Sequence, residues 1–211
     1  MLYTSSTTAY GFYPDNDYPL VEESPLRGND DFTYSKNKKE IEGIMEEFVT
    51  KNPKIKVAIL RPCFVAGPGF KNPLATHLMR KFVILPSKNA PFQFVHEDDL
   101  IDIMTLLFER EIGGIYNIGG EGTITFDEMV KMLGNITVHI PPKLLFLLNN
   151  FAWYLRLKFL SKFPSTALNL MLYPWVATSE KLIKDTGYKF KYDTVSAFEG
   201  FVRYVKSAGG K

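Results

Sequence analysis

The sequence predicts an α/β fold, in which amphipathic helices alternate with short apolar strands. Residues 34–51 place apolar side chains at three- and four-residue spacing, which is typical of a helix with one buried face. These side chains are Ile41, Ile44, Met45 and Phe48. The segment Ile55–Leu60 follows, bounded by Pro53 and Pro62, and it has the pattern of a buried strand. Helices that pack against such strands define the α/β class.

The composition is that of an ordinary globular protein. The 211 residues are 45% hydrophobic and 23% charged, which allows one or two domains with a core. The net charge of +2 is too small to indicate a nucleic-acid partner. Cys63 is the one cysteine, so an internal disulfide is excluded, and at a strand end it is expected to pack as a small hydrophobe. The three histidines and Cys63 show no metal-ligand spacing, so we predict no metal site.

The N-terminal segment places hydroxyl groups at the end of a strand. Residues 2–5 are predicted to form a strand that leads into the cluster Ser5-Ser6-Thr7-Thr8. Residues 11–33 are rich in glycine, proline, aspartate and asparagine and are predicted to form a loop over the site. The polar start of the chain lacks the basic region of a signal peptide, and we expect a cytoplasmic protein.

The middle of the chain continues the alternation of helices and strands. Residues 70–83 are predicted to form a short helix with Leu78 and Phe82 on its inner side. Pro91–Val95 is predicted to be a strand, and Asp98–Arg110 a helix. The acids at the start of this second helix, Asp98 and Asp99, are interpreted as helix capping groups rather than a catalytic pair.

The C-terminal third begins with a strand and a well-marked helix. Ile115–Ile118 is predicted to be a strand, and Thr125 followed by Glu128 is a capping box that starts a helix running to about Leu133. A last amphipathic helix over roughly 195–205 completes the chain.

The segment 140–172 is unusually apolar but is interrupted by charged and amide side chains. No unbroken run of about 18 apolar residues survives, so a transmembrane helix is not expected. One interpretation is a helix of the substrate lobe packed on the core. The other is contact of residues 140–165 with a membrane surface. The cations that would then face the lipid headgroups are Lys143, Arg156, Lys158 and Lys162.

Tyr34 and Lys38 are the residues that most strongly suggest a chemistry. Four positions apart, they share one face of the helix. A nearby lysine can lower the pKa of the tyrosine phenol, which then exchanges a proton with a substrate oxygen that Ser6 orients. The spacing alone also fits a surface lysine beside a half-buried tyrosine.

Five segments in order along residues 2 to about 135 resemble motifs of the extended short-chain dehydrogenase/reductases, the family of NAD(P)-dependent sugar-nucleotide epimerases, dehydratases and related reductases. They are Ser6-Thr7-Thr8-Ala9-Tyr10-Gly11, Tyr34 with Lys38, Ile59 to Gly69 with its Arg-Pro and Gly-Pro-Gly, Phe94-Val95-His96-Glu97-Asp98-Asp99-Leu100, and Tyr116-Asn117-Ile118-Gly119-Gly120. The family carries a hydrophobic residue where Glu97 stands.

The resemblance implies the C-terminal portion of a doubly wound Rossmann-like parallel sheet and a smaller, mostly helical substrate lobe. Residues 1–66 and 92–120 would belong to the sheet domain, and residues 67–91 and 121–211 to the lobe.

The resemblance also implies a catalytic set of Ser6, Tyr34 and Lys38. NAD or NADP would contact Lys38, Pro62, Phe64 and Val65. A nucleotide-sugar or comparable hydroxy or keto substrate would meet Thr7, Thr8 and His96. For His96 a structural hydrogen bond to a backbone carbonyl is an equal alternative, and Arg61 is expected to form a structural ion pair rather than bind phosphate.

The family's opening Gly-x-x-Gly-x-x-Gly turn, which binds the dinucleotide pyrophosphate, does not occur in these 211 residues. We therefore expect a truncated chain that is inactive alone and binds a dinucleotide weakly or not at all. The alternatives are a non-catalytic binding or scaffold fragment, or a reductase of apolar, steroid- or flavonoid-like substrates. Without a neighbour for the strand at 2–5, self-association or binding of a complementary N-terminal half is expected.

Overall fold

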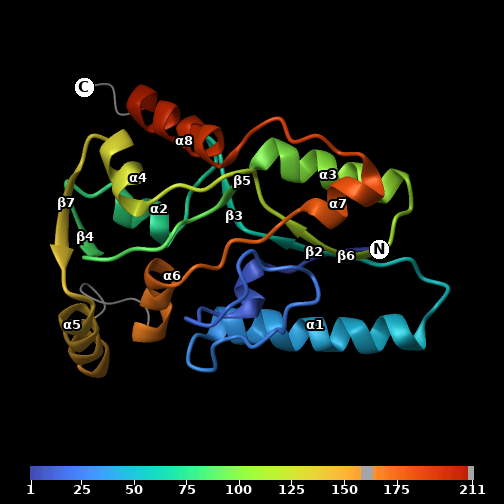
Figure 1. Cartoon of the computed structure of the whole chain (residues 1–211), viewed down its shortest axis with the longest axis horizontal. Helices are drawn as coiled ribbons and strands as arrows, with labels where there is room; N and C mark the ends of the chain where they lie inside the picture. The colour runs from blue at the N-terminus through green and yellow to red at the C-terminus, as the bar shows by residue number, and fades with distance from the viewer. Residues whose placement is uncertain (158–163, 209–211) are drawn as a thin grey trace.

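The computed structural model describes residues 1–157 and 164–208, and they form the α/β fold that the sequence predicts (Figure 1). The strands are β1 (Leu2–Thr4), β2 (Ala58–Pro62), β3 (Phe64–Ala66), β4 (Phe82–Pro86), β5 (Phe94–His96), β6 (Gly114–Ile118) and β7 (Ile136–Ile140). The α-helices are α1 (Thr33–Lys51), α2 (Pro73–Leu78), α3 (Glu97–Glu109), α4 (Phe126–Met132), α5 (Pro142–Tyr154), α6 (Asn169–Leu172), α7 (Glu180–Thr186) and α8 (Thr194–Ala208). Two 3₁₀ helices, η1 (Thr7–Tyr10) and η2 (Ser165–Leu168), complete the set.

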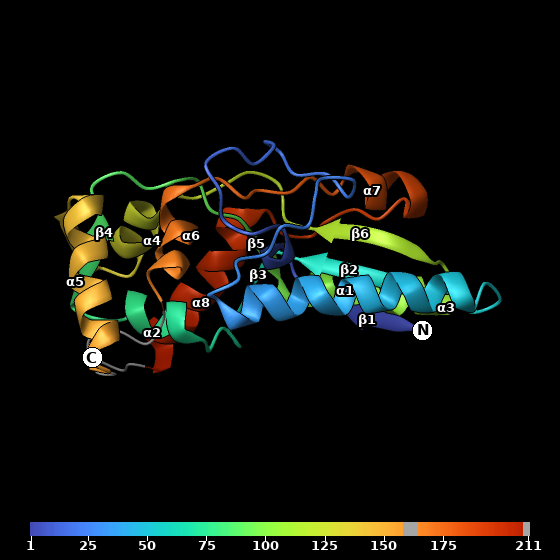
Figure 2. The same ribbon diagram turned by 90° about the horizontal axis from the view of Figure 1, so that it is seen from below.

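A three-stranded parallel sheet in the order β1-β2-β6 lies between two layers of helices. Helix α1 covers one face, and α3 and α7 cover the other (Figures 1 and 2). Side chains of β2 alternate between the layers. Ile59 packs in the cluster with Met45 of α1, whereas Leu60 packs in the cluster with Ile103 of α3. This sandwich of helix, sheet and helix is the doubly wound arrangement.

The rest of the chain is organised around two further pairs of parallel strands, β3-β5 and β4-β7. A large core joins them to α2, α4 and α8. Aromatic rings dominate its centre, where the ring centre of Phe92 lies 5.0 to 5.4 Å from the ring centres of Phe94, Phe126 and Trp175. The division into a sheet domain and a lobe stays a prediction.

The prediction for residues 70–83 was partly wrong. Asn72 caps α2 by accepting a hydrogen bond from the backbone N–H of Ala75, but the helix ends at Leu78. Phe82 instead begins β4 and is 56% exposed. Residues 82–85 alternate between exposed and buried side chains, so the period here is two rather than 3.6. Strand β7, the partner of β4, was not predicted.

Two other boundaries also differ from the predictions. The strand predicted at 55–60 is displaced, since β2 spans Ala58–Pro62 and Ile55 is exposed. Asp99 is not a capping group, because its buried carboxylate accepts hydrogen bonds from the Tyr188 hydroxyl at 2.7 Å and from the Lys191 N–H at 2.9 Å. The capping box of Thr125 and Glu128 is present as predicted.

The edge of the main sheet is formed by β1. Its one partner in the described residues is β2, so its outer edge carries unpaired backbone groups. Helix α1 also exposes apolar side chains on one side, with Ile41 38% and Ile44 62% exposed, whereas Met45 is buried as predicted.

Candidate active site

The hydroxyl cluster lies at the carboxyl ends of β1 and β2. After β1, Ser6 caps the 3₁₀ helix η1, and its Oγ accepts a hydrogen bond from the Thr8 N–H at 3.2 Å. The Thr7 Oγ1 donates to the Pro62 carbonyl at 3.5 Å, which joins the two strand ends. In open α/β sheets ligands bind at this carboxyl edge. All three hydroxyl residues are buried.

Helix α1 brings Tyr34 and Lys38 to the same place. Its first turn is fixed to η1 by the Ser35 Oγ, which donates to the Thr8 carbonyl at 2.6 Å. One turn later the Lys38 Nζ donates to the Thr4 carbonyl at 2.8 Å and lies 5.7 Å from the ring centre of Tyr34. Tyr34 remains 51% exposed and is therefore open to a ligand.

The environment of Lys38 alters its acidity. Burial lowers the pKa of the Lys38 ammonium, and the Glu42 carboxylate, four residues further along α1, partly opposes this shift. Tyr34, Lys38 and Glu42 thus form a stripe at four-residue spacing on the side of α1 that faces β1.

The last residue of this stripe, Glu42, forms a buried ion pair with Arg61 of β2. The Arg61 guanidinium binds the Glu42 carboxylate, with Nη2 to Oε2 at 2.6 Å and Nε to Oε2 at 2.9 Å, and both side chains are at most 2% exposed. Ser5 Oγ donates to the same carboxylate. The structural ion pair predicted for Arg61 is therefore present, but sequence reasoning missed its partner. The four-residue step from Lys38 to Glu42 was the signal.

The outer part of the same network reaches the loop that crosses the site. Arg61 Nη1 donates to the Tyr10 hydroxyl at 2.7 Å and to the Glu22 carbonyl at 2.8 Å. The Tyr10 hydroxyl in turn donates to Asn117 Oδ1 at 2.8 Å. Burial raises the pKa of Tyr10 to about 12, although Arg61 opposes the shift. The network holds α1, β2, β6 and the loop in one arrangement.

Thr8 has one feature that distinguishes it from its neighbours. Its Oγ1 is buried and has no hydrogen-bond partner in the described part of the chain. A buried hydroxyl without a partner costs free energy, and in a native protein it often marks a position that a ligand or water fills. Thr8 therefore fits a site that receives a polar ligand.

The residues predicted to meet a nicotinamide ring follow directly after β2. Pro62 and Cys63 are buried, whereas Phe64 and Val65 are half-buried in β3. The Phe64 ring packs 4.9 Å from Phe92 and 5.6 Å from Trp175. Burial raises the pKa of the Cys63 thiol, in keeping with a packed side chain rather than a reactive one.

His96 lies at the end of β5 and is 5% exposed. Its Nδ1 accepts a hydrogen bond from the Asp98 N–H at 3.1 Å, which caps α3, and its ring stacks on Tyr192 with centres 3.8 Å apart. The partner is thus a backbone N–H and not the carbonyl that was predicted. A contact between His96 and substrate stays a prediction.

Glu97, which departs from the family pattern, has a structural partner. The Gly69 N–H donates to both carboxylate oxygens of Glu97, at 3.3 and 3.2 Å. A side chain at Gly69 would lie 2.5 Å from Glu97 Oε2, and Gly67 has a φ of +145°. A carboxylate of the protein thus occupies the Gly67-Pro68-Gly69 turn, and the Gly69 N–H is not free for a phosphate.

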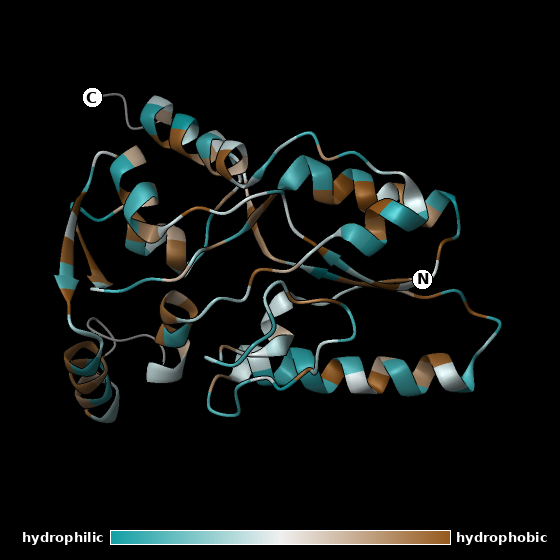
Figure 3. Ribbon diagram, in the orientation of Figure 1, coloured by the Kyte–Doolittle hydropathy of each residue, from teal (hydrophilic) through white to brown (hydrophobic). Residues whose placement is uncertain are grey.

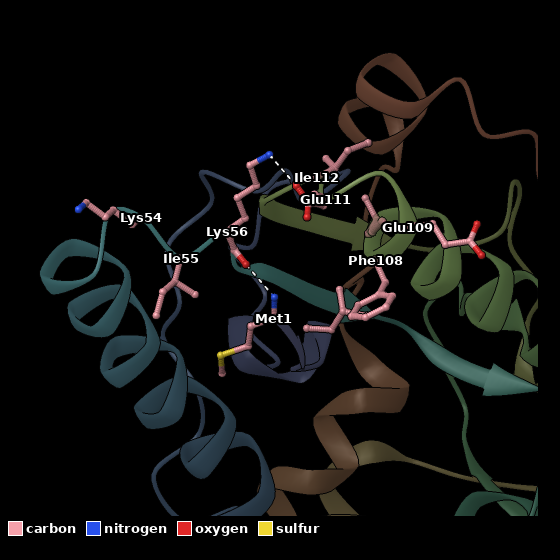
Figure 4. A pocket seen from close by; sticks show the side chains of 10 residues that line it. Met1, Lys54, Ile55, Lys56, Phe108, Glu109, Glu111 and Ile112 are labelled. Carbon is pink, nitrogen blue, oxygen red and sulfur yellow. Dashed lines mark hydrogen bonds and ion pairs between the residues drawn. The ribbon is translucent and has the colours of Figure 1, made fainter.

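A cavity of about 500 Å³ lies at the opposite, amino edge of the sheet (Figure 4). Met1, Lys56 and Phe108 are among its lining residues, and the Met1 ammonium donates to the Lys56 carbonyl at 2.8 Å. Because it opens at the amino ends of β1 and β2, it is separate from the candidate active site.

The chain is similar to known proteins both in sequence and in fold. The model of the NAD dependent epimerase/dehydratase family matches residues 1–119, which is more than half of the chain. The chain belongs to this family. Curated relatives include uncharacterised proteins of Mycobacterium tuberculosis and Mycobacterium bovis. Each is 24% identical over 200 residues, which cover 94% of this chain and 52% of the relative. The chain thus spans about half the length of these relatives.

Solved structures share the fold. RMD from Pseudomonas aeruginosa, complexed with NADPH, superposes with a TM-score of 0.70 at 16% identity, over 98% of this chain and 66% of that one. The dTDP-glucose 4,6-dehydratase DesIV from Streptomyces venezuelae, with NAD bound, gives 0.69 at 18% identity, over 99% and 60%. The UDP-Glc/GlcNAc 4-epimerase of Campylobacter jejuni gives 0.66 at 17% identity, over 98% and 64%.

Proposed function

We propose that this chain is the catalytic C-terminal part of an NAD(P)-dependent enzyme that epimerises, dehydrates or reduces a nucleotide-sugar or a related hydroxy or keto substrate. The observation that carries the proposal is the placement of Tyr34 and Lys38 beside the Ser6 turn, at the carboxyl edge of the sheet. The family match and the nucleotide-sugar enzymes among the structural neighbours support it.

Each residue of this set has a distinct task. Tyr34 is the general acid and base that moves a proton to or from a substrate oxygen. Lys38, held by the Thr4 carbonyl, lowers the free energy of the phenolate and binds the nicotinamide ribose. Ser6, with Thr7 and Thr8, orients the substrate oxygen. The dinucleotide, when bound, supplies or accepts the hydride.

The chain's own residues fit the nicotinamide end of the dinucleotide better than its pyrophosphate end. Tyr34 is half exposed with the Lys38 Nζ 5.7 Å from its ring centre, and the buried Thr8 hydroxyl on the adjoining turn η1 has no partner within the described residues. In contrast, the 211 residues lack a Gly-x-x-Gly-x-x-Gly turn, and the glycine turn at 67–69 already binds Glu97. The pyrophosphate therefore needs a glycine-rich half from elsewhere.

The proposed activity can be tested by supplying such a half. We would join a family Gly-x-x-Gly-x-x-Gly half before Met1 and follow conversion of UDP- and dTDP-sugars by chromatography in the presence of NAD or NADP. Turnover that depends on the dinucleotide is the expected result. A joined protein that binds the dinucleotide yet converts none of these sugars would contradict the substrate class.

The second candidate is a binding or scaffold fragment without activity of its own, and the occupied glycine turn favours it for the 211 residues alone. Calorimetric titration of the chain with NAD⁺ and NADP⁺ is expected to show no binding tighter than about millimolar, because the 211 residues lack the glycine-rich turn that places a helix N-terminus at the pyrophosphate. Micromolar affinity would overturn this expectation. The cytoplasmic location stays a prediction.

Association is the next expected property. The outer edge of β1 and the exposed Ile41 and Ile44 of α1 favour pairing with a complementary N-terminal half or with a second copy. Size-exclusion chromatography with light scattering should show species larger than the 24.1 kDa chain, which a glycine-rich half converts to a defined complex. A sharp monomer at every concentration that ignores the added half would contradict the prediction.

A further inference from the structure

Helix α5 exposes an apolar stripe to solvent. Leu144, Leu147, Leu148, Phe151 and Leu155 follow one another at three- and four-residue spacing and therefore share one side of the helix and its C-terminal end. Their side chains are between 46% and 65% exposed. A helix on the surface of a globular protein ordinarily turns such a stripe inward.

The two asparagines of α5 bind the neighbouring 3₁₀ helix η2. Asn149 Nδ2 donates to Ser165 Oγ at 2.9 Å, and Ser165 Oγ donates to Asn150 Oδ1. Ser165 is itself buried, as is Ala152 on the same helix. The amides therefore attach α5 to η2, and the apolar stripe stays on the side of the helix that is open to solvent.

The two-stranded sheet next to α5 adds to this apolar surface. Phe82 lies opposite Ile136, and Ile84 lies opposite Val138, in the register of β4 and β7. All four side chains are at least 40% exposed. Strand β7 leads directly into α5, and Figure 3 shows β4, β7 and α5 together at one end of the molecule with much apolar colouring. We call this surface the lobe end.

The segment that contains β7 and α5 carries basic and no acidic side chains, and the acid paired with it is Asp127 of α4, which contacts His139 of β7. From residue 129 to residue 179 there is no aspartate or glutamate, whereas the basic residues are Lys131, Lys143, Arg156, Lys158 and Lys162. Lys158 and Lys162 lie outside the described residues. Because the whole chain has a net charge of +2, removing these five charges leaves −3 for the remainder. Positive charge is thus concentrated in the same segment as the exposed apolar stripe.

Within residues 1–157 and 164–208, no helix is long and apolar enough to cross a membrane. We propose that the lobe end binds the surface of an anionic phospholipid bilayer, with the stripe of α5 at the level of the headgroups. The leucine and phenylalanine side chains of the stripe can insert among the apolar chains just below the headgroups. Lys143 and Arg156, at the two ends of the helix, can bind the negatively charged headgroups. A second copy of the chain fits less well, because two positively charged ends would face each other.

Flotation with lipid vesicles tests the proposal on the 211-residue chain. We expect the protein to float with vesicles made of equal parts phosphatidylcholine and phosphatidylglycerol, and not with phosphatidylcholine alone. Leu147→Glu with Phe151→Glu should weaken partitioning at least about tenfold. The double substitution removes two exposed apolar side chains and adds two negative charges that the anionic surface repels. Raising the salt concentration should also release the protein.

The matched control places the same two charges at the other end of the molecule. Ile101→Glu with Phe108→Glu on α3 changes side chains that are 60% and 68% exposed, comparable with Leu147 at 65% and Phe151 at 62%. This variant should float like the unmodified chain. Thermal melting of both variants confirms that they fold.

Three results would overturn the proposal. The first is failure to recover the unmodified chain with anionic vesicles, and the second is an α5 variant that floats as well as the α3 variant. The third result is a dimer of the unmodified chain, seen by light scattering without vesicles, that the α5 variant abolishes and the α3 variant keeps. It would assign the lobe end to contact with a second copy of the chain.

Discussion

Replacing Tyr34 by phenylalanine is expected to lower turnover of the joined, dinucleotide-binding protein by about 10² to 10⁴ fold, the usual contribution of a general acid or base. The substitution removes one hydroxyl from a side chain that is half exposed, so neither packing nor the Lys38 bond to the Thr4 carbonyl should change. Measured kcat should fall, while the affinity for the dinucleotide stays within a few fold.

Tyr204→Phe provides a matched control for this prediction. Tyr204 lies on α8, is 39% exposed, and has the Lys71 Nζ 5.9 Å from its ring centre, a tyrosine–lysine pair much like that of Tyr34 and Lys38. Its loss should leave turnover unchanged. If Tyr34→Phe retained most of the activity, or if both substitutions reduced it equally, the assignment of Tyr34 as acid and base would be wrong.

Local signals in the sequence were sufficient where one element determines its own structure. The helix predicted at 34–51 is found at Thr33–Lys51, and the capping box of Thr125 and Glu128 is formed. In both cases the information lies within a few residues, as periodic apolar positions or as a side chain that binds its own helix. The α/β class followed from these elements and from the family resemblance.

The pairing of strands that are far apart in the sequence could not be predicted from local patterns. Strands β4 and β7 are five residues each and pair across more than fifty residues of sequence, so neither gains its structure from its neighbours alone. Phe82 was assigned to a helix because a four-residue step from Leu78 fits that period, yet the partner strand imposes a period of two.

In the candidate site, too, local motifs were predictable and contacts between distant segments were not. The sequence indicated the side chains that we propose to act on the substrate, because Ser6, Tyr34 and Lys38 stand in a recognisable order. It did not name Glu42, whose importance depends on a guanidinium from another element, nor the contact between Glu97 and the Gly69 N–H. Partners that lie behind a site are determined by tertiary packing, and charge alone does not identify them.

Breaking the pair of Arg61 and Glu42 is expected to be the most destabilising single change in the sheet. Arg61→Met would leave a buried carboxylate with Ser5 as its remaining donor, and would take a donor from the Tyr10 hydroxyl. Removing one partner of a buried pair costs about 3–5 kcal/mol, a large part of a typical free energy of unfolding of about 5–15 kcal/mol. Urea unfolding at neutral pH measures the loss directly.

Two further variants show how much of the lost stability comes from the unpaired buried charge and how much from lost packing. Arg61→Met combined with Glu42→Leu should lose less than the sum of the two single changes, because no unpaired charge is left in the interior. Arg27→Met breaks the exposed pair with Asp15, whose side chains are 32% and 72% exposed, and should cost no more than about 1 kcal/mol. Strict additivity in the double variant, or an equal loss in Arg27→Met, would show that the Arg61–Glu42 pair does not hold α1 against the sheet. With that pair intact, α1 keeps Tyr34 and Lys38 beside the Ser6 turn.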